Sequence, residues 1–274
     1  MLRDHRDPLR FTTWLVPGLP LGFFETIAEA VATRLGSDFD LSVAEGSSGP
    51  MDTADDRFAQ ATTDIGFVCS TSYLWLSAAD VRSVSLVPLA PVFDDPRAEG
   101  RPVYFSDVVV AADGPISSFA DLAGKRVGFN DDSSLSGYIS LLARLGDDGH
   151  RTDRFADFRA VGSHRTALAL IANGEIDAAA VDANALRAWI REDPERAPLV
   201  RSVEVLGPYP VQPIVVRASD DAGLVDVVAE QLRSPALLAA VKRFGVDGFA
   251  PVDHDYYSAV NDRIALAATA IAAP

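Results

Sequence analysis

The chain has 274 residues, of which 48% are hydrophobic and 8% aromatic, enough to bury the cores of two lobes. Its formal net charge of −15 excludes the basic surface that binding to nucleic acid or to an anionic membrane requires. The one cysteine, Cys69, excludes an internal disulfide and a cysteine-cluster metal site. A small anionic ligand stays compatible with this charge, because hydrogen bonds from nearby N–H groups can outweigh the repulsion from a net charge that is spread over the whole protein.

The start of the chain, MLRDHRDPLRF, is charged and lacks the apolar core of a secretory signal. No stretch of the sequence reaches the roughly 18 apolar residues of a membrane-spanning helix. From these residues we expect a cytoplasmic protein without membrane insertion, or an exported protein whose leader has been removed.

The first half of the chain alternates predicted strands with predicted helices. Short apolar or alternating runs predict strands over residues 9–16, 39–44, 64–69, 84–90 and 104–111. Apolar residues at helical spacing predict a helix over residues 23–35 that ends at Gly36. Residues 57–62 are predicted to close a short helix, and residues 70–72 to cap another.

The central stretch, residues 125–145, combines a strand, a turn and a helix. Residues 125–130 have β-character, residues 133–137 (SSLSG) form a small-residue turn, and apolar residues then recur at helical spacing. The first N–H groups of a helix lack partners and lie at the positive end of its dipole. With serine hydroxyls beside them, they predict an anion site at Ser134 and Ser136; the alternative is an ordinary serine N-cap.

The second half continues the alternation and defines the fold class. Strands are predicted over residues 157–161, 177–181, 203–206 and 211–216, and helices over residues 164–173, 184–191 and from 223 onwards. The alternation favours a parallel, doubly wound α/β fold, whose ligands gather at the carboxyl ends of strands. The residues expected at those ends are Trp14, Ser47, Ser48, Ser70, Asn130, Ser134, Ser136, Gly162, His164 and Asp182.

Three segments of the chain resemble the phosphate/phosphite/phosphonate solute-binding proteins of ABC transporters. They are DLAGKRVGFNDDSSLSGY, VGSHRTALALIANGEIDAAAVDANAL and LGPYPVQPIVVR, which keep the family order. The resemblance implies a type II periplasmic-binding-protein fold, in which two lobes joined by two crossover strands close on an anion in a central cleft. We expect residues 1–107 and 208–274 to form lobe 1, and residues 108–207 lobe 2.

The resemblance also implies a set of ligand contacts, which are Tyr104, Ser134, Ser136, His164 and, at the cleft edge, Asp182. Leu135 replaces a hydroxyl residue that is common in the family, so only its backbone N–H can contribute. Gln212 stands where aminophosphonate binders have an acid, which disfavours an amino-bearing ligand. Trp14 suits the core as well as a ligand platform, and Ser47 and Ser70 complete the candidates.

No motif predicts chemistry, a metal site or an organic cofactor: the four histidines lack metal-ligand spacing, and no G-x-S-x-G, Walker A or GxGxxG occurs. We therefore expect a monomeric binding protein for a small oxyanion such as phosphate, phosphite or a phosphonate, with an ABC transporter permease as partner. The alternative is a cytosolic enzyme or a ligand sensor on the same fold, acting on a small carboxylate or phosphonate metabolite.

Overall fold

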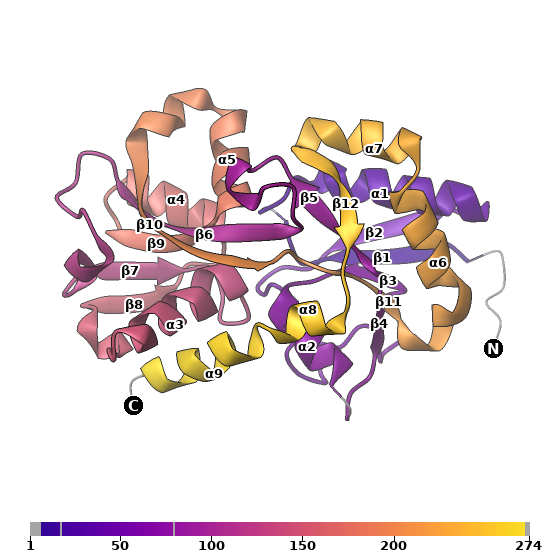
Figure 1. The fold of residues 1–274 in the computed structure, drawn as a ribbon, viewed down its shortest axis with the longest axis horizontal. Helices are drawn as coiled ribbons and strands as arrows, with labels where there is room; N and C mark the ends of the chain where they lie inside the picture. Colours follow the sequence, from indigo (N-terminus) through magenta and orange to yellow (C-terminus); the bar gives the residue numbers. More distant parts are fainter. Residues whose placement is uncertain (1–6, 17, 79, 272–274) are drawn as a thin grey trace. The chain divides into compact units, whose positions relative to one another are not determined.

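The computed structural model describes residues 7–16, 18–78 and 80–271, which divide by their contacts into two units (Figure 1). Unit 1 comprises the described residues of Met1–Val16, Pro20–Val103 and Pro210–Ser258. Unit 2 comprises those of Pro17–Leu19, Tyr104–Tyr209 and Ala259–Pro274. The expected division had residues 208–274 in the first lobe, whereas the described residues 259–271 group with unit 2 by their contacts. The chain thus passes between the units again after Ser258, in addition to the two expected crossings.

The sheet of unit 1 is mixed and has the strand order β2-β1-β3-β11-β4. β1 (Leu9–Thr13) pairs in parallel with β2 (Phe39–Val43) and β3 (Ile65–Phe67). β11 (Ile214–Arg217) runs antiparallel to both β3 and β4 (Val84–Leu86). The predicted parallel pairing therefore holds for β1, β2 and β3, whereas β11 runs antiparallel to its neighbours and makes the sheet mixed.

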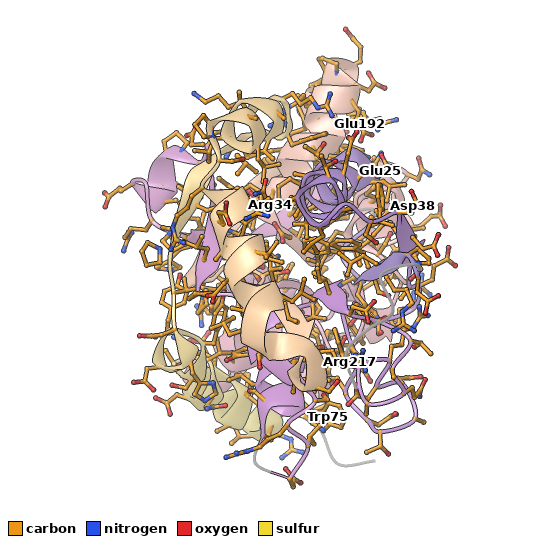
Figure 2. All side chains as sticks on the ribbon, turned by 90° about the vertical axis from the view of Figure 1, so that its right-hand side faces the viewer. Glu25, Arg34, Asp38, Trp75, Glu192 and Arg217 are labelled. Atoms are coloured by element: carbon orange, nitrogen blue, oxygen red, sulfur yellow. The ribbon has the colours of Figure 1, made fainter. Side chains whose placement is uncertain are left out.

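Two helices of unit 1 pack on this sheet, α1 (Leu21–Leu35) and α6 (Asp221–Leu232), and α7 (Pro235–Val241) packs against both of them. α1 ends where predicted, at Gly36, whose left-handed φ of 63° lets its N–H bond the carbonyls of the last turn. Arg34, near the end of α1, extends toward α6 and pairs with Glu230 at 3.3 Å (Figure 2). Since both side chains are exposed, the pair contributes little to stability.

The rest of unit 1 departs from the predicted elements in two places. The predicted strand over residues 84–90 is split between β4 and β5 (Leu89–Phe93). β5 pairs antiparallel with β12 (Val246–Pro251), which lies where the sequence predicted only helix. β12 contains a glycine and ends in proline, so its apolar pattern is too weak to predict a strand. The helices α2 (Ser70–Ser77) and α8 (His254–Ser258) complete this unit.

The helix predicted over residues 57–62 is absent, and hydrogen-bonded turns take its place. Asp56 starts them as a helix cap would, because its carboxylate accepts from the N–H groups of Phe58 and Ala59 at 3.0 Å. Ala61 then adopts a positive φ of 54°, which no helix residue has. The segment therefore ends after one turn.

The sheet of unit 2 has the order β10-β6-β9-β7-β8. β7 (Arg126–Phe129) lies parallel to β8 (Asp157–Ala160) and β9 (Ala178–Asp182), whereas β6 (Val103–Ala111) runs antiparallel to β9. β10 (Val200–Pro210) is much longer than the predicted strand over residues 203–206. This sheet is therefore also mixed, with its parallel part where the anion site was predicted.

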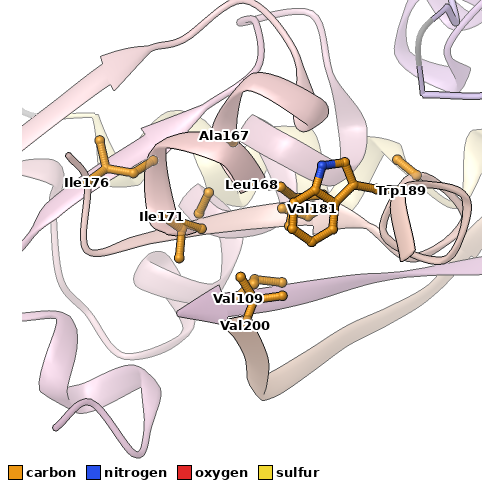
Figure 3. Close-up of a cluster of buried hydrophobic side chains, with 10 residues drawn as sticks. Val109, Ala167, Leu168, Ile171, Ile176, Val181, Trp189 and Val200 are labelled. Atoms are coloured by element: carbon orange, nitrogen blue, oxygen red, sulfur yellow. The ribbon is translucent and has the colours of Figure 1, made fainter. Parts of the chain in front are cut away.

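Helices cover both sides of the unit 2 sheet (Figure 1). α4 (His164–Ala172) and α5 (Ala183–Glu192) lie on one side, and α3 (Ser140–Asp147) and α9 (Asn261–Ala270) on the other. A cluster of buried side chains joins α4 and α5 to the sheet, and includes Val109, Leu168, Ile171, Val181 and Trp189 (Figure 3). On the other side α9 packs along α3, where Arg263 pairs with Asp147 at 2.7 Å.

Short 3-10 helices occupy several of the loops, namely Pro96–Ala98, Phe119–Leu122, Thr152–Arg154, Pro194–Leu199, Ala218–Asp220 and Lys242–Phe244. Within the described ranges, no helix combines the length and the apolar character that crossing a bilayer requires.

Candidate functional site

Three helical segments of unit 2 begin just beyond the carboxyl ends of the parallel strands β7, β8 and β9. The π-helical turn η3 (Leu135–Ile139) follows β7 and leads into α3, while α4 follows β8 and α5 follows β9. Gly162 connects two of these ends, because its N–H donates to the Asn130 carbonyl at 2.9 Å. Carboxyl strand ends of this kind are where open α/β sheets bind ligands.

The η3 turn begins at Ser134, which is an N-cap and also the first predicted anion-site serine. Its hydroxyl oxygen accepts from the Gly137 N–H at 3.1 Å, and its carbonyl accepts from the Ile139 N–H at 3.0 Å. The second bond spans five residues and so defines a π-turn, a wider geometry that recurs at functional sites. The Ser134 oxygen therefore acts as an ordinary N-cap, which was the alternative to an anion site. The hydrogen of the same hydroxyl can still donate to a ligand.

Ser136, the second serine, is held in place on both its backbone and its side chain. Its carbonyl accepts from the Ser106 hydroxyl at 2.7 Å and also from the Ser140 hydroxyl. Its own Oγ lies 3.1 Å from Nε2 of His164. All four residues are buried, so this network fixes where the Ser136 hydroxyl lies.

His164 is the first residue of α4 and is only 8% exposed. Burial lowers the pKa of its imidazole to about 4, so the ring is neutral at neutral pH. Nε2 faces Ser136, while Nδ1 is buried without a hydrogen-bond partner among the described residues. The Ser136–His164 pair is therefore a contact between neutral groups.

Gly137 is required by the close packing of the η3 turn against its neighbours. A Cβ at this position would lie 1.7 Å from Oδ1 of Asn130 and 3.1 Å from Cε1 of His164. The nearby Asp131 carboxylate accepts from Nδ2 of Asn130 at 2.7 Å and from the Ser133 N–H at 3.0 Å. The Asp131 carboxylate therefore accepts hydrogen bonds from its own turn, which is a common role of aspartate in turns.

Asp182 caps α5 and lies beside the serine network. Its Oδ1 accepts from the Asn184 N–H at 2.7 Å. Across the sheet Asp182 stands opposite Ser106 of β6, so both side chains leave the same face of the sheet, and Tyr104, two residues before Ser106, shares that face. The structure therefore brings five predicted residues, Tyr104, Ser134, Ser136, His164 and Asp182, into one unit beside one sheet edge.

Tyr104 is 2% exposed, and its ring lies 6.3 Å from that of Tyr209. Burial raises the pKa of Tyr209 to about 12, and its hydroxyl hydrogen-bonds Ser140, so Tyr209 belongs to the same network. Leu135 contributes differently, because its side chain is fully buried and only its backbone is available at the turn.

The remaining candidates all belong to unit 1. Trp14 follows β1, Ser47 follows β2, Ser70 follows β3, and Gln212 precedes β11. The Trp14 ring stacks on Phe58 at 6.0 Å and packs over Gly66 of β3, so the core role is the one its packing supports. Ser70 does not cap α2 as predicted; its hydroxyl donates to the Pro210 carbonyl at 3.0 Å instead.

Three residues of unit 2 beside this network were not among the sequence candidates: Ser106, Ser140 and Asn184. Ser106 and Ser140 hold the Ser136 carbonyl, and Asn184 follows the Asp182 cap. Ser106 could have been found by its place two residues after Tyr104 on a predicted strand. Ser140 and Asn184 carry no sequence signal, since polar residues in a first helical turn are common.

The fold and this network define a class of protein: a two-unit α/β binding protein of the type II periplasmic kind, with an oxyanion-suited helix start. The family model for the periplasmic substrate-binding protein of phosphonate ABC transporters matches residues 23–257. The chain belongs to this family of ABC-transporter substrate-binding proteins, as the sequence resemblance predicted.

Solved structures from several bacteria have the same fold. The binding-protein component of an ABC phosphonate transporter from Pseudomonas aeruginosa is 16% identical, with a TM-score of 0.77 over 97% of this chain and 87% of the other. PhnD1 from Prochlorococcus marinus, solved with methylphosphonate, is 14% identical, with a TM-score of 0.78 over 93% and 96% of the two chains. The Escherichia coli aliphatic sulphonate-binding protein is 15% identical, with a TM-score of 0.59 over 99% and 93%.

Proposed function

We propose that this protein binds a small phosphorus oxyanion, such as a phosphonate, phosphite or phosphate, as the substrate-binding component of an ABC transporter. The observation that carries the proposal is the η3 turn, where Ser134 and Ser136 stand at a helix start with their positions fixed by neighbours. Hydroxyl and N–H donors at a helix start favour an oxyanion through hydrogen bonds and the helix dipole. The phosphonate-transporter component from Pseudomonas aeruginosa and the methylphosphonate complex of PhnD1 support the same chemistry.

In this proposal each residue of the network has one task. The Ser134 and Ser136 hydroxyls and the first N–H groups of the η3 turn, those of Leu135 and Ser136, donate to the ligand oxygens. His164 bonds Ser136 through Nε2 and so orients the Ser136 hydroxyl. The other proposed contacts are Tyr104, Asp182, Gln212, Ser47 and Ser70.

Binding without chemistry is favoured over an enzyme on the same fold. The Ser136–His164 contact of 3.1 Å has the distance of a nucleophile–base pair. In such pairs a third group orients the base through its other nitrogen, whereas Nδ1 of His164 has no partner within the described part of the chain. A pKa of about 4 also makes His164 a weak base at neutral pH. The geometry supports a donor network rather than a catalytic dyad.

The family supports a proposal for where this protein works and for its partner. Its members are periplasmic components of ABC transporters, so we propose that the protein works outside the cytoplasmic membrane and delivers its ligand to a permease. A ligand sensor without a permease would use the same residues and differ only in that partner.

Isothermal titration calorimetry against phosphate, phosphite, methylphosphonate and methanesulfonate tests the proposed ligand class. We expect at least one phosphorus oxyanion to bind with micromolar or tighter affinity, and the same ligand to be recovered unchanged by mass spectrometry. A ligand converted by the wild-type protein but not by His164→Asn would show an enzyme. Binding of none of the phosphorus oxyanions would contradict the proposal.

A further inference from the structure

Apart from the short loop Pro17–Leu19, the chain passes between the two units at three places. These are Val103–Tyr104, Tyr209–Pro210 and Ser258–Ala259, so three connecting segments join the units. Motion of two joined units requires backbone rotation in the segments that connect them. The contacts that hold the ends of these segments therefore decide how freely the segments rotate.

One backbone carbonyl, that of Pro102, joins the ends of all three segments within unit 1. Pro102 lies just before the first segment, and its carbonyl accepts from the N–H of Val211, just after the second segment, at 3.1 Å. The same carbonyl accepts from the hydroxyl of Tyr256, just before the third segment, at 2.5 Å. A carbonyl oxygen has two lone pairs, so it can accept both hydrogen bonds at once. A single acceptor thus connects parts of the chain that are far apart in the sequence.

Tyr256 is itself held firmly enough to act as an anchor. Its side chain is partly buried, and its ring meets that of Tyr257 nearly at a right angle, with the centroids 5.3 Å apart. Its backbone N–H donates to Oδ1 of Asp253 at 2.8 Å, at the start of α8. Burial raises the pKa of Tyr256 to about 12, so the hydroxyl keeps its proton and donates throughout the physiological range.

We propose that Tyr256 is a positioning residue for ligand binding, which ties the unit 1 ends of the three connecting segments together through the Pro102 carbonyl. This inference rests on the proposed function and concerns a residue outside the proposed set of ligand contacts. With the tie in place, rotation in one segment is coupled to rotation in the other two, because their ends are bonded to each other. Without it the third segment rotates more freely, so the ligand-free protein has more conformations to lose when it binds.

The chain offers two matched tyrosines for the test. Tyr257, the next residue, is fully buried, and its hydroxyl has no hydrogen-bond partner among the described residues. Tyr257→Phe therefore removes a hydroxyl that ties nothing. The Tyr73 hydroxyl hydrogen-bonds Nδ1 of His254 at 3.0 Å, so Tyr73→Phe removes a bond to the same helix, α8, without touching Pro102. Compared with these two variants, Tyr256→Phe isolates the bond to the Pro102 carbonyl.

Hydrogen-exchange mass spectrometry of the ligand-free proteins tests the tie itself. We expect the Val211 amide to exchange several-fold faster in Tyr256→Phe, because the segment end that it bonds is no longer held by α8. The peptide over residues 209–213 reports this amide well, since two of its five residues are prolines without an N–H. Both controls should exchange there as wild type does. Unchanged exchange in Tyr256→Phe, or an equal acceleration in Tyr73→Phe, would overturn the tie.

Titration calorimetry with methylphosphonate tests the consequence for binding. We expect the affinity of Tyr256→Phe to fall several-fold, about the effect of one lost hydrogen bond, while both controls bind as wild type does. A hydroxyl with a structural role alone would change the melting temperature and leave affinity as it is. Unchanged affinity of Tyr256→Phe, in a protein whose wild type binds the probe, would therefore overturn the positioning role. If the wild type binds no phosphorus oxyanion, the proposed function and the positioning role both fail, and the exchange rates still decide whether Tyr256 ties the segments.

Discussion

At the scale of single residues, the network depends on groups that tolerate no change of size or charge. Gly137 has no room for a side chain, because Asn130 and His164 lie against its Cα. His164 stays neutral because burial disfavours its charged form. Both features come from close packing around the η3 turn, and each leads to a measurable consequence.

Replacing Gly137 by alanine should damage both folding and binding. The new Cβ would meet Asn130 Oδ1 at 1.7 Å, so the turn must shift, at a cost of about 1–3 kcal/mol in the free energy of unfolding. Affinity for the oxyanion should fall at least tenfold, because the shift displaces Ser136. Urea unfolding and calorimetry measure the two effects. Gly223→Ala in α6, where a Cβ meets nothing within 4 Å, is the control and should leave affinity unchanged and stability equal or slightly higher.

His164 should make the folded chain less stable in acid. Its pKa is about 4 when folded and about 6.5 when unfolded, so between these values the unfolded chain binds the extra proton. Stability from this group is fully present above pH 6.5 and falls as the pH drops toward 4, by at most about 3 kcal/mol. Unfolding free energies of wild type and His164→Gln, compared from pH 7 to pH 4, measure this change. A difference between the two proteins that stays constant with pH would contradict it.

At the scale of elements, strong local patterns were predictable and contacts between distant segments were not. The α1 helix follows from its apolar spacing and from Gly36, and the strand–turn–helix over residues 125–145 follows from composition. β12 was missed because glycine and proline interrupt it, and the direction of β11 depends on how the chain returns to unit 1. The sequence suggested Ser134, Ser136 and His164 as candidates, partly through family resemblance, and their role in ligand binding stays a prediction. Ser106 could have been inferred only from its place two residues after Tyr104, and Ser140 not at all, since its role exists only through a contact with Ser136.

The N-cap of η3 should combine a structural role with a binding role, and a matched pair of variants separates them. Ser134→Ala removes the acceptor of the Gly137 N–H and should cost about 1 kcal/mol of stability. Ser234→Ala removes the corresponding cap of α7, whose hydroxyl accepts from the Leu237 N–H at 3.3 Å, and should cost about as much. Only Ser134→Ala should also weaken oxyanion binding, several-fold by calorimetry. Equal affinities in the two variants would limit Ser134 to capping.

At the scale of the whole molecule, the net charge of −15 opposes an anionic ligand at long range, while the donors of the η3 turn act only at contact. Salt separates these two effects, because it shortens the Debye length from about 30 Å at 0.01 M to about 8 Å at 0.15 M. A dianionic ligand approaching such a surface therefore meets a repulsion that salt can remove.

The association rate of a phosphonate dianion should accordingly rise several-fold between 0.01 M and 0.15 M sodium chloride. Stopped-flow tryptophan fluorescence measures this rate, and the dissociation rate should change much less. A zwitterionic ligand without net charge gives the comparison and should show little salt dependence. An association rate that falls with salt would indicate that local positive groups dominate the approach.

The packing of α9 along α3 also has a consequence for the order in which the protein forms as it is synthesised. α3 continues directly from the η3 turn, and its covering helix lies more than a hundred residues later in the chain. A growing chain that has completed β10 has every strand of unit 2 but not the helix that covers α3. Leu266 of α9, which would lie 3.0 Å from a Cβ at Gly146, reaches α3 only after α9 itself has left the ribosome. The support of the proposed binding turn is therefore made after every strand of unit 2, so a nascent chain should acquire its full affinity only once α9 has emerged.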